Sequence, residues 1–267
     1  MRVAVIDSGL GMVAYAAALA RMRPDLELVL ARDPDYMPYG LLEPHQIAER
    51  IVTVASACAR HDVDAIVIAC NTGSMYALES ARARFEPGIP VIGVVPAIRP
   101  AGATGRPFAV WATAAATVSD YQTGLIARFA SPELAHRIPC YGLAEAIDSG
   151  SSSLVADAIA RAAAATPADT ESVVLGCTHY GLVRDEIVAA LAARTGREPQ
   201  VFDSPEPVAR QTLRRLGLAP HGVSGGRPGA VVAVIESGRP GTLPPQLAAY
   251  PAGRLLLSRC DPAEKIS

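Results

Sequence analysis

The sequence predicts an α/β protein made of two similar parallel-sheet domains. Short apolar runs rich in β-branched residues alternate with helix-like stretches along nearly the whole chain, which is typical of βαβ units. Two of these runs, 65–69 and 172–176, each end immediately before a cysteine, Cys70 and Cys177. Between the two halves, the Pro-rich stretch 96–107 has no apolar period and indicates a domain boundary.

The first half contains four apolar runs that predict strands and three longer periodic stretches that predict helices. The clearest helix begins at Pro44 and extends to about Arg60, because Ile47, Ile51 and Val54 recur on one face. In chain order we expect a strand at 2–6, a helix near 11–22, a strand at 26–31, the helix at 44–60, a strand at 64–69, a helix near 73–85 and a strand at 91–95.

The second half repeats this alternation. We expect strands at 108–112, 138–142, 172–176 and 199–202, with helices near 117–129, 143–148, 152–165 and 180–194. A third portion begins with a helix start at Ser204-Pro205 and continues through the loop 217–229 to a strand at 230–236 and a Pro-rich tail. The pattern alone does not show which domain this last portion joins.

The composition excludes several classes of protein. The chain has 267 residues, and its formal net charge of −2 offers no attraction for nucleic acid or an anionic membrane. No apolar stretch reaches the roughly 18–20 residues of a membrane-spanning helix, and Asp7 follows the N-terminus too closely for a signal peptide. We therefore expect a cytoplasmic protein. The only lysine is Lys265, which argues against pyridoxal phosphate, since that cofactor needs a buried lysine.

The five cysteines are widely spaced and include no CxxC pair, so neither a disulfide framework nor a metal site is expected. Cys58, Cys140 and Cys260 are expected to be small hydrophobic residues of the core or tail. Cys70 and Cys177 differ, because each precedes polar residues at a predicted helix N-terminus. That environment lowers the pKa of a thiol below its usual value of about 8.5.

The two thiols lie at the ends of predicted parallel strands, and ligands bind at this edge of an open sheet. A second polar strand end precedes each thiol at nearly equal spacing, at Asp7 and at Thr113. Two opposed thiols suit a reaction in which one group removes a proton from one face of a carbon and another returns a proton to the opposite face. His179 follows Cys177 closely and is a candidate to orient or deprotonate a group at this edge.

Other polar residues have two readings each. Asn71, Thr72 and Thr178 are placed to donate hydrogen bonds to a carboxylate or simply to cap the following helices. Residues 9–14 match the G-x-G-x-x-A pattern of dinucleotide sites, but the charge of Asp7 would repel a pyrophosphate, so this reading ranks behind the thiol pair.

Five motifs in this order resemble the glutamate racemases of the aspartate/glutamate racemase superfamily, over roughly residues 3 to 210. They are Ile6-Asp7-Ser8-Gly9-Leu10-Gly11, Pro38-Tyr39-Gly40, Ile68-Ala69-Cys70-Asn71-Thr72, Val91-Ile92-Gly93-Val94 and Leu175-Gly176-Cys177-Thr178-His179-Tyr180. The resemblance implies two pseudo-symmetric α/β domains (Rossmann-like, flavodoxin-like) with the active site between them. It assigns 1–97 plus 207–267 to the first domain and 98–206 to the second.

The resemblance also implies an activity: the interconversion of L- and D-glutamate for peptidoglycan, by a two-base mechanism without cofactor or metal, in a homodimer. Cys70 would act on the D-enantiomer and Cys177 on the L-enantiomer, assisted by Asp7 and His179. The residues implied to hold substrate are Ser8, Pro38, Tyr39, Gly40, Asn71, Thr72, Thr113, Thr117, Glu145 and Thr178, and the loop 113–117 leaves open which threonine does so.

Three residues depart from the family pattern: Met12 replaces a usual glycine, Gly73 a usual alanine and Gly181 a usual proline. These departures keep two alternatives open, a racemase of another small acidic amino acid and a ligand-binding member with altered catalysis. A dinucleotide oxidoreductase ranks third and is separable by testing whether the protein binds NADH.

Overall fold

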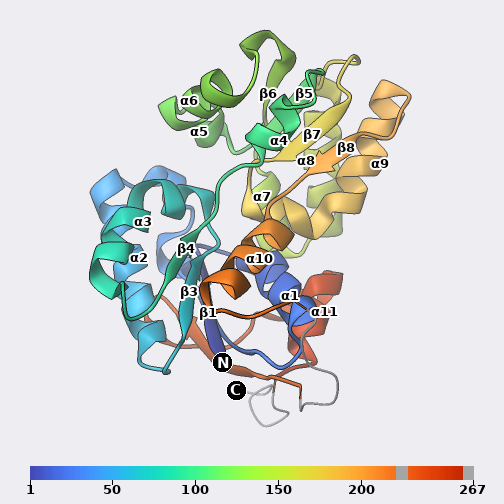
Figure 1. The fold of residues 1–267 in the computed structure, drawn as a ribbon. Coiled ribbons are helices and arrows are strands. Elements are labelled where there is room, and N and C mark those ends of the chain that lie inside the picture. Colours follow the sequence, from blue (N-terminus) through green and yellow to red (C-terminus); the bar gives the residue numbers. More distant parts are fainter. Residues whose placement is uncertain (221–227, 261–267) are drawn as a thin grey trace. The chain divides into compact units, whose positions relative to one another are not determined.

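The computed structural model describes residues 1–220 and 228–260 (Figure 1). The expected loop 217–229 is therefore described only at its two ends, and Lys265 lies outside the described residues. The chain divides into two compact units, one formed by Met1–Val95 with the segment that begins at Pro205, the other by Pro96–Ser204. Each unit is a parallel sheet covered by helices, which confirms the predicted α/β class with two domains.

The described part of the first unit contains a six-stranded sheet in the order β10-β9-β2-β1-β3-β4. All neighbours pair in parallel except the short edge strand β10, which is antiparallel to β9. The strands are β1 (Arg2–Asp7), β2 (Glu27–Arg32), β3 (Ala65–Ile68), β4 (Val91–Gly93), β9 (Val231–Glu236) and β10 (Arg239–Pro240). The third portion of the chain thus extends the first sheet through β9.

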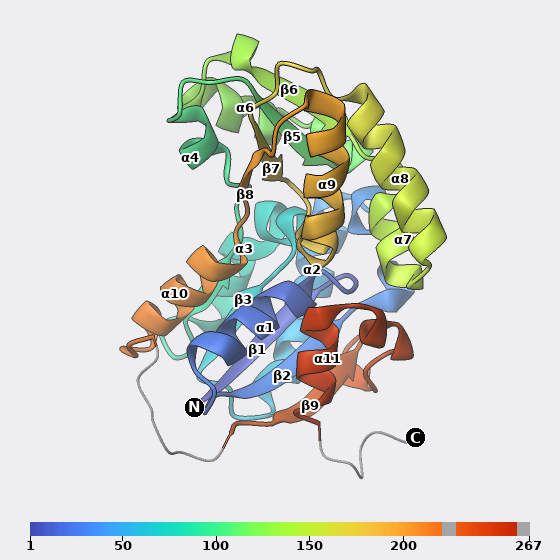
Figure 2. The same cartoon turned by 90° about the vertical axis from the view of Figure 1, so that its right-hand side faces the viewer.

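Helices cover both faces of this sheet. On one face, α2 and α3 pack together and bury Ile47, Ile51 and Val54 against the sheet residues Ile6 and Ile68. On the other face, α1 packs against α10 and α11 (Figure 2). The helices are α1 (Met12–Met22), α2 (Pro44–Ala59), α3 (Asn71–Phe85), α10 (Pro205–Arg215) and α11 (Pro251–Leu257), with short 3₁₀ turns η1 (Pro34–Tyr36), η2 (Tyr39–Leu41) and η5 (Pro245–Ala249).

The second unit contains a four-stranded parallel sheet in the order β6-β5-β7-β8. Phe108, Val110 and Val174 face a core completed by α4 and α6, while the Trp111 indole on the opposite face donates to Thr166 at the end of α8 (3.1 Å). The elements are α4 (Ile98–Gly102), β5 (Phe108–Ala112), α5 (Ala114–Thr117), α6 (Asp120–Phe129), η3 (Pro132–Leu134), β6 (Ala135–Pro139), α7 (Leu143–Ser149), α8 (Ser152–Ala165), β7 (Ser172–Leu175), η4 (Thr178–Val183), α9 (Arg184–Thr195) and β8 (Gln200–Phe202).

The two units share one strand order: the second strand, then the first, the third and the fourth. This is the flavodoxin-like order. The register matches as well, because the Ala69 N–H donates to the Ile6 carbonyl and the Gly176 N–H donates to the Trp111 carbonyl, each at 2.7 Å. Each thiol residue therefore follows the third strand of its unit at the same place in the sheet.

This register corrects one expected equivalence. Asp7 and Ala112 directly follow the paired residues Ile6 and Trp111, so they occupy corresponding places, and Thr113 corresponds to Ser8 rather than to Asp7. The residue spacing misled because the second unit has a longer crossover between its first and third strands.

Several element bounds also differ from expectation. The helix expected at 117–129 is α6, which begins only at Asp120, because the Ser119 hydroxyl accepts from the Gln122 N–H (3.1 Å) and caps it; the short helix α5 precedes it. The strand expected at 138–142 is β6, which begins at Ala135; as an edge strand it buries only Ile138 and so lacks an apolar run. The Pro-rich stretch 96–107 contains the short helix α4, and the tail contains α11.

Among residues 1–220 and 228–260, no helix combines the length and the apolarity needed to cross a membrane.

Candidate active site

Cys70 lies where β3 ends and α3 begins. Its backbone is extended, it caps the helix, and its sulfur accepts a hydrogen bond from the Gly73 N–H at 3.3 Å. An amide at a helix N-terminus favours a negatively charged sulfur. Cys70 is only 6% exposed, so solvent screens the contact between its sulfur and this amide very little. Asn71 and Thr72, which the sequence nominated as substrate donors, form the first turn of the same helix.

Gly73 explains one departure from the family pattern. A Cβ at this position would lie 3.0 Å from Ile51 Cδ1 and 3.2 Å from the Cys70 Cβ. Ile51 on α2 therefore fills the space that an alanine side chain would need. The glycine keeps α3 close to α2 without displacing the thiol.

Asp7 is the last residue of β1, the strand beside β3, and Ser8 follows it. Asp7 is fully buried, and its Oδ1 accepts from the Ser8 N–H at 2.7 Å and from the Ser8 hydroxyl at 3.4 Å. The structure thus brings Asp7, Ser8 and Cys70 to the carboxyl edge of two adjacent strands, as the sequence predicted.

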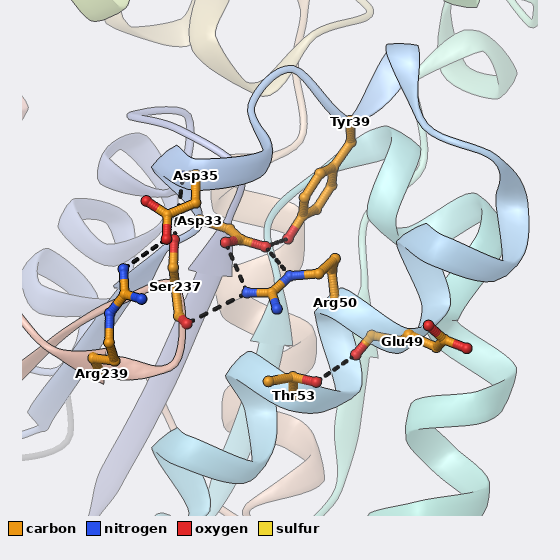
Figure 3. Close-up of polar contacts among 8 residues, drawn as sticks. All are labelled: Asp33, Asp35, Tyr39, Glu49, Arg50, Thr53, Ser237 and Arg239. Carbon is orange, nitrogen blue, oxygen red and sulfur yellow. Dashed lines mark hydrogen bonds and ion pairs between the residues drawn. The ribbon is translucent and has the colours of Figure 1, made fainter.

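The Pro38-Tyr39-Gly40 segment contributes a buried tyrosine to the same unit. Pro38 is half-buried and Gly40 is exposed, whereas Tyr39 is 1% exposed and belongs to the core cluster that contains Cys70. Burial, followed by the nearby charges of Asp33 and Cys70, raises the pKa of Tyr39 far above its usual range. The Tyr39 hydroxyl therefore stays protonated and donates to Asp33 Oδ2 at 2.8 Å (Figure 3).

Cys177 occupies the corresponding place in the second unit, between β7 and the turn η4. Gly176 before it is required, because a Cβ there would lie 2.8 Å from the Trp111 carbonyl oxygen on β5. The Cys177 sulfur lies 3.6 Å from His179 Nδ1, and His179 Nε2 lies 3.2 Å from Asp148 Oδ2. The three side chains form a thiol–imidazole–carboxylate relay.

His179 carries its charge because of its two partners. Burial opposes protonation of the imidazole, but the Asp148 carboxylate and the Cys177 sulfur outweigh it and raise the pKa of His179 well above the usual 6.5. A protonated imidazole donates from both nitrogens, to the carboxylate on one side and to the sulfur on the other. The imidazolium therefore places a positively charged hydrogen-bond donor beside the Cys177 sulfur.

The acidic partner of His179 is Asp148, a residue that the sequence did not nominate, while the role implied for Glu145 stays a prediction. Both residues belong to α7, one turn apart. Glu145 is exposed on the first turn, whereas the Asp148 side chain is 17% exposed and faces the imidazole. The sequence places two acidic residues on this short helix, and none of its features indicates that Asp148 rather than Glu145 contacts His179.

The nominated threonines have local roles in the structure. The Thr113 hydroxyl accepts from the Ala116 N–H at 3.3 Å and caps α5, and the Thr117 hydroxyl donates to the Thr113 carbonyl at 2.9 Å. Thr178 is buried at the start of η4. Thr113, at the place of Ser8 in the other unit, lies at the strand end, whereas Thr117 lies one helical turn away from it.

Cys140 and Tyr180 are two further buried groups near Cys177. Burial raises the pKa of both side chains above their usual ranges, and the Cys177 charge adds to the effect in each. Cys140 follows β6, where its N–H donates to the Ala112 carbonyl at 2.8 Å. Both groups thus remain neutral next to the relay. Among the residues that the structure describes, no three His, Cys, Asp or Glu side chains are grouped so as to hold a metal ion.

Comparison with known proteins decides the family. A profile of the family described as Asp/Glu/Hydantoin racemase matches residues 7–217. The chain belongs to this racemase family. It is therefore a racemase, an isomerase by reaction class, and the resemblance drawn from the five motifs is confirmed.

Relatives within the racemase family align over most of the chain. The glutamate racemase of Salmonella gallinarum is 35% identical over 221 residues, which cover 79% of this chain and 75% of the relative. The crystal structure of Escherichia coli glutamate racemase, in complex with L-glutamate and the activator UDP-MurNAc-Ala, matches with a TM-score of 0.76 and 28% identity, over 93% of this chain and 91% of that one. The glutamate racemase of Thermus thermophilus, in complex with β-chloro-D-alanine, matches with a TM-score of 0.69 and 26% identity, over 97% and 94%.

Three residues that the sequence did not nominate contact the nominated ones or their partners: Asp148, Asp33 and Arg50. Signals for two of them were present. Asp33 directly follows β2, next to the strand that ends at Asp7, and Arg50 lies on the apolar face of α2, between Ile47 and Val54, where a charged residue needs a buried partner.

Proposed function

We propose that this racemase interconverts L- and D-glutamate, with Cys70 and Cys177 as the two proton-transferring groups and with no cofactor. The observation that carries the proposal is the duplicated placement of the thiols, each at the end of the third strand of its unit. The relatives named glutamate racemase support the choice of substrate.

The chemistry requires the two cysteines to be in opposite protonation states. A thiolate takes the α-proton, forming an S–H bond as the C–H bond breaks, and the thiol on the opposite face gives its proton to the same carbon. After one turnover the two protonation states are exchanged. For L-glutamate, Cys177 would begin as the thiolate, supported by the His179–Asp148 pair. Asp7 would serve the corresponding step at Cys70.

The carbanion character at the α-carbon needs electrostatic stabilisation, since no electron sink takes part. Amide and hydroxyl donors aimed at the substrate carboxylate serve this purpose, because they withdraw charge from the adjacent carbon. Asn71, Thr72 and Thr178 at the two helix starts are the proposed donors, with Ser8 and Thr113 at the strand ends. We further propose that the product supplies D-glutamate for peptidoglycan in the cytoplasm and that the protein is a homodimer.

The test is proton exchange followed by NMR. The protein is incubated in D₂O with L-glutamate, D-glutamate or L-aspartate, with EDTA present and no pyridoxal phosphate, and loss of the α-proton is recorded. We expect both enantiomers of glutamate to exchange and aspartate to exchange far more slowly. The variant Cys260→Ser should exchange glutamate like the wild type, since its half-buried thiol lies in the tail and takes no part in the proposed site. Loss of exchange on EDTA treatment, or faster exchange of aspartate, would contradict the proposal.

A further inference from the structure

A buried ion pair lies behind the Tyr39 segment. Asp33 is fully buried where β2 ends, and its N–H donates to the Ser8 carbonyl at 3.2 Å. Arg50 on α2 reaches it with two bonds, from Nε to Oδ2 at 2.9 Å and from Nη2 to Oδ1 at 3.0 Å. A guanidinium matches both oxygens of a carboxylate, so this bidentate contact is geometrically specific.

The ion pair holds the Tyr39 side chain. Asp33 Oδ2 accepts from both Arg50 and the Tyr39 hydroxyl (Figure 3). The Tyr39 hydroxyl therefore points towards the ion pair, while its ring is buried in the core cluster that contains Cys70. The turn η2, which contains Tyr39, packs against α3, the helix that Cys70 caps.

The tail supplies the third anchor. Ser237 and Gly238 form the two-residue turn between β9 and β10, and both have positive φ angles, 50° and 87°, as a tight hairpin turn requires. The Ser237 carbonyl accepts from Arg50 Nη2 at 3.4 Å, and the Ser237 hydroxyl accepts from the Asp35 N–H at 3.2 Å. The turn thus contacts both α2 and the segment that leads to Tyr39.

We propose that Arg50 is a positioning residue, which joins Asp33 to the Ser237 carbonyl and so fixes the Pro38-Tyr39-Gly40 segment beside Cys70. The tail is then part of the active-site framework through the β9–β10 turn. The effect on turnover rests on the proposed glutamate racemisation, whereas the position of the segment is measurable without it. The Arg239–Asp35 pair is largely exposed and adds little to this clamp.

The test compares Arg50→Gln and Arg50→Lys with the matched control Arg23→Gln. Arg23 makes an equivalent bidentate pair with Asp25, at 2.7 and 2.6 Å, but near the opposite, amino-terminal end of β2. Met37 directly precedes the segment and serves as a reporter: the protein is labelled with [methyl-¹³C]methionine, and the Met37 resonance is assigned with Met37→Leu. Glutamate kinetics are measured on the same samples.

In Arg50→Gln, the Met37 resonance should shift or broaden and KM should rise about tenfold to a hundredfold, with kcat changed far less, because a bond to a buried charge contributes roughly 1.5–3 kcal/mol. Arg50→Lys should recover only part of this, since an ammonium cannot make the bidentate contact and also reach Ser237. Arg23→Gln should lose stability but leave Met37 and KM unchanged.

An unchanged Met37 resonance in both Arg50 variants would overturn the proposal, and so would an equal rise in KM in Arg23→Gln. If Arg50→Gln fails to fold, Arg50→Lys, which keeps the charge, decides the matter in the same way. If the wild-type protein does not racemise glutamate, the proposed function fails, but the Met37 resonance still shows whether Arg50 holds the segment.

Discussion

Replacing Asp148 by asparagine tests the relay that the structure places behind Cys177. The substitution keeps the shape of the side chain and removes its charge. The imidazole of His179 then loses the larger of the two partners that together offset its burial, so the pKa of His179 should fall. The charge-assisted hydrogen bond lost is worth roughly 1.5–3 kcal/mol, which corresponds to a loss of about tenfold to a hundredfold in kcat/KM.

The same substitution should make stability depend differently on pH. Because the pKa of His179 is raised in the folded protein, its contribution to stability is fully present below the unfolded value of about 6.5 and is lost as pH rises through the folded value. The stability difference between wild type and Asp148→Asn should therefore be largest below about pH 6.5 and shrink at alkaline pH.

Three measurements check this prediction: the ¹⁵N resonances of His179, assigned with His179→Asn; urea unfolding as a function of pH; and racemisation kinetics. The matched control is Glu145→Gln on the same helix, which removes an exposed acid one turn away. If Asp148→Asn titrates and turns over like wild type, or if Glu145→Gln has the same effect, the relay plays no part in catalysis.

Further predictions concern the thiols and the packing around them. Cys70→Ser and Cys177→Ser should each lower racemisation by several orders of magnitude, since a serine hydroxyl is a far weaker acid than a thiol. On a substrate that eliminates a β-leaving group, each variant should still deprotonate the enantiomer that its remaining cysteine serves; equal loss on both enantiomers would show that the thiols do not divide the work. Gly73→Ala should cost about 1–3 kcal/mol in urea unfolding, because its Cβ would press on Ile51. The cost should fall in an Ile51→Val background, and strict additivity of the two changes would argue against this contact. Truncation after β10 should lower stability more than kcat, because α11 packs on α1 on the face opposite α2 and α3; a stable truncated protein without turnover would be the contrary result.

Much of the fold was predictable because buried parallel strands have a strong signature. The strands 65–68 and 172–175 are buried along their whole length, and buried parallel strands are composed almost entirely of apolar residues. The strand β6 was misplaced for the opposite reason: it lies at an edge, and four of its five residues are half-buried. The start of α6 depends on the cap that Ser119 provides, and the spacing of apolar residues does not reveal such a cap.

The candidate site was predictable where a motif sits at a strand end and unpredictable where a helix brings a side chain from elsewhere in the chain. Cys70, Cys177 and Asp7 lie at or just beyond the ends of strands, so their neighbourhood follows from the sheet. Asp148 reaches His179 from thirty-one residues away, and Arg50 reaches Ser237 across 187. Such contacts depend on how helices pack against the sheet, which composition and spacing do not specify.

The two units share a strand order but not their acids. Asp7 ends the first strand of one unit where Ala112 ends it in the other, and Asp33 has Cys140 as its counterpart. In the proposed mechanism, two groups of residues that are not mirror images of one another would act on mirror-image molecules. Enantiomers have equal free energies in water, so their equilibrium constant is unity and the Haldane relation makes kcat/KM equal in the two directions. The unequal halves therefore cannot favour one enantiomer at equilibrium; they can only set how kcat and KM are divided for each, and hence which enantiomer saturates the enzyme first.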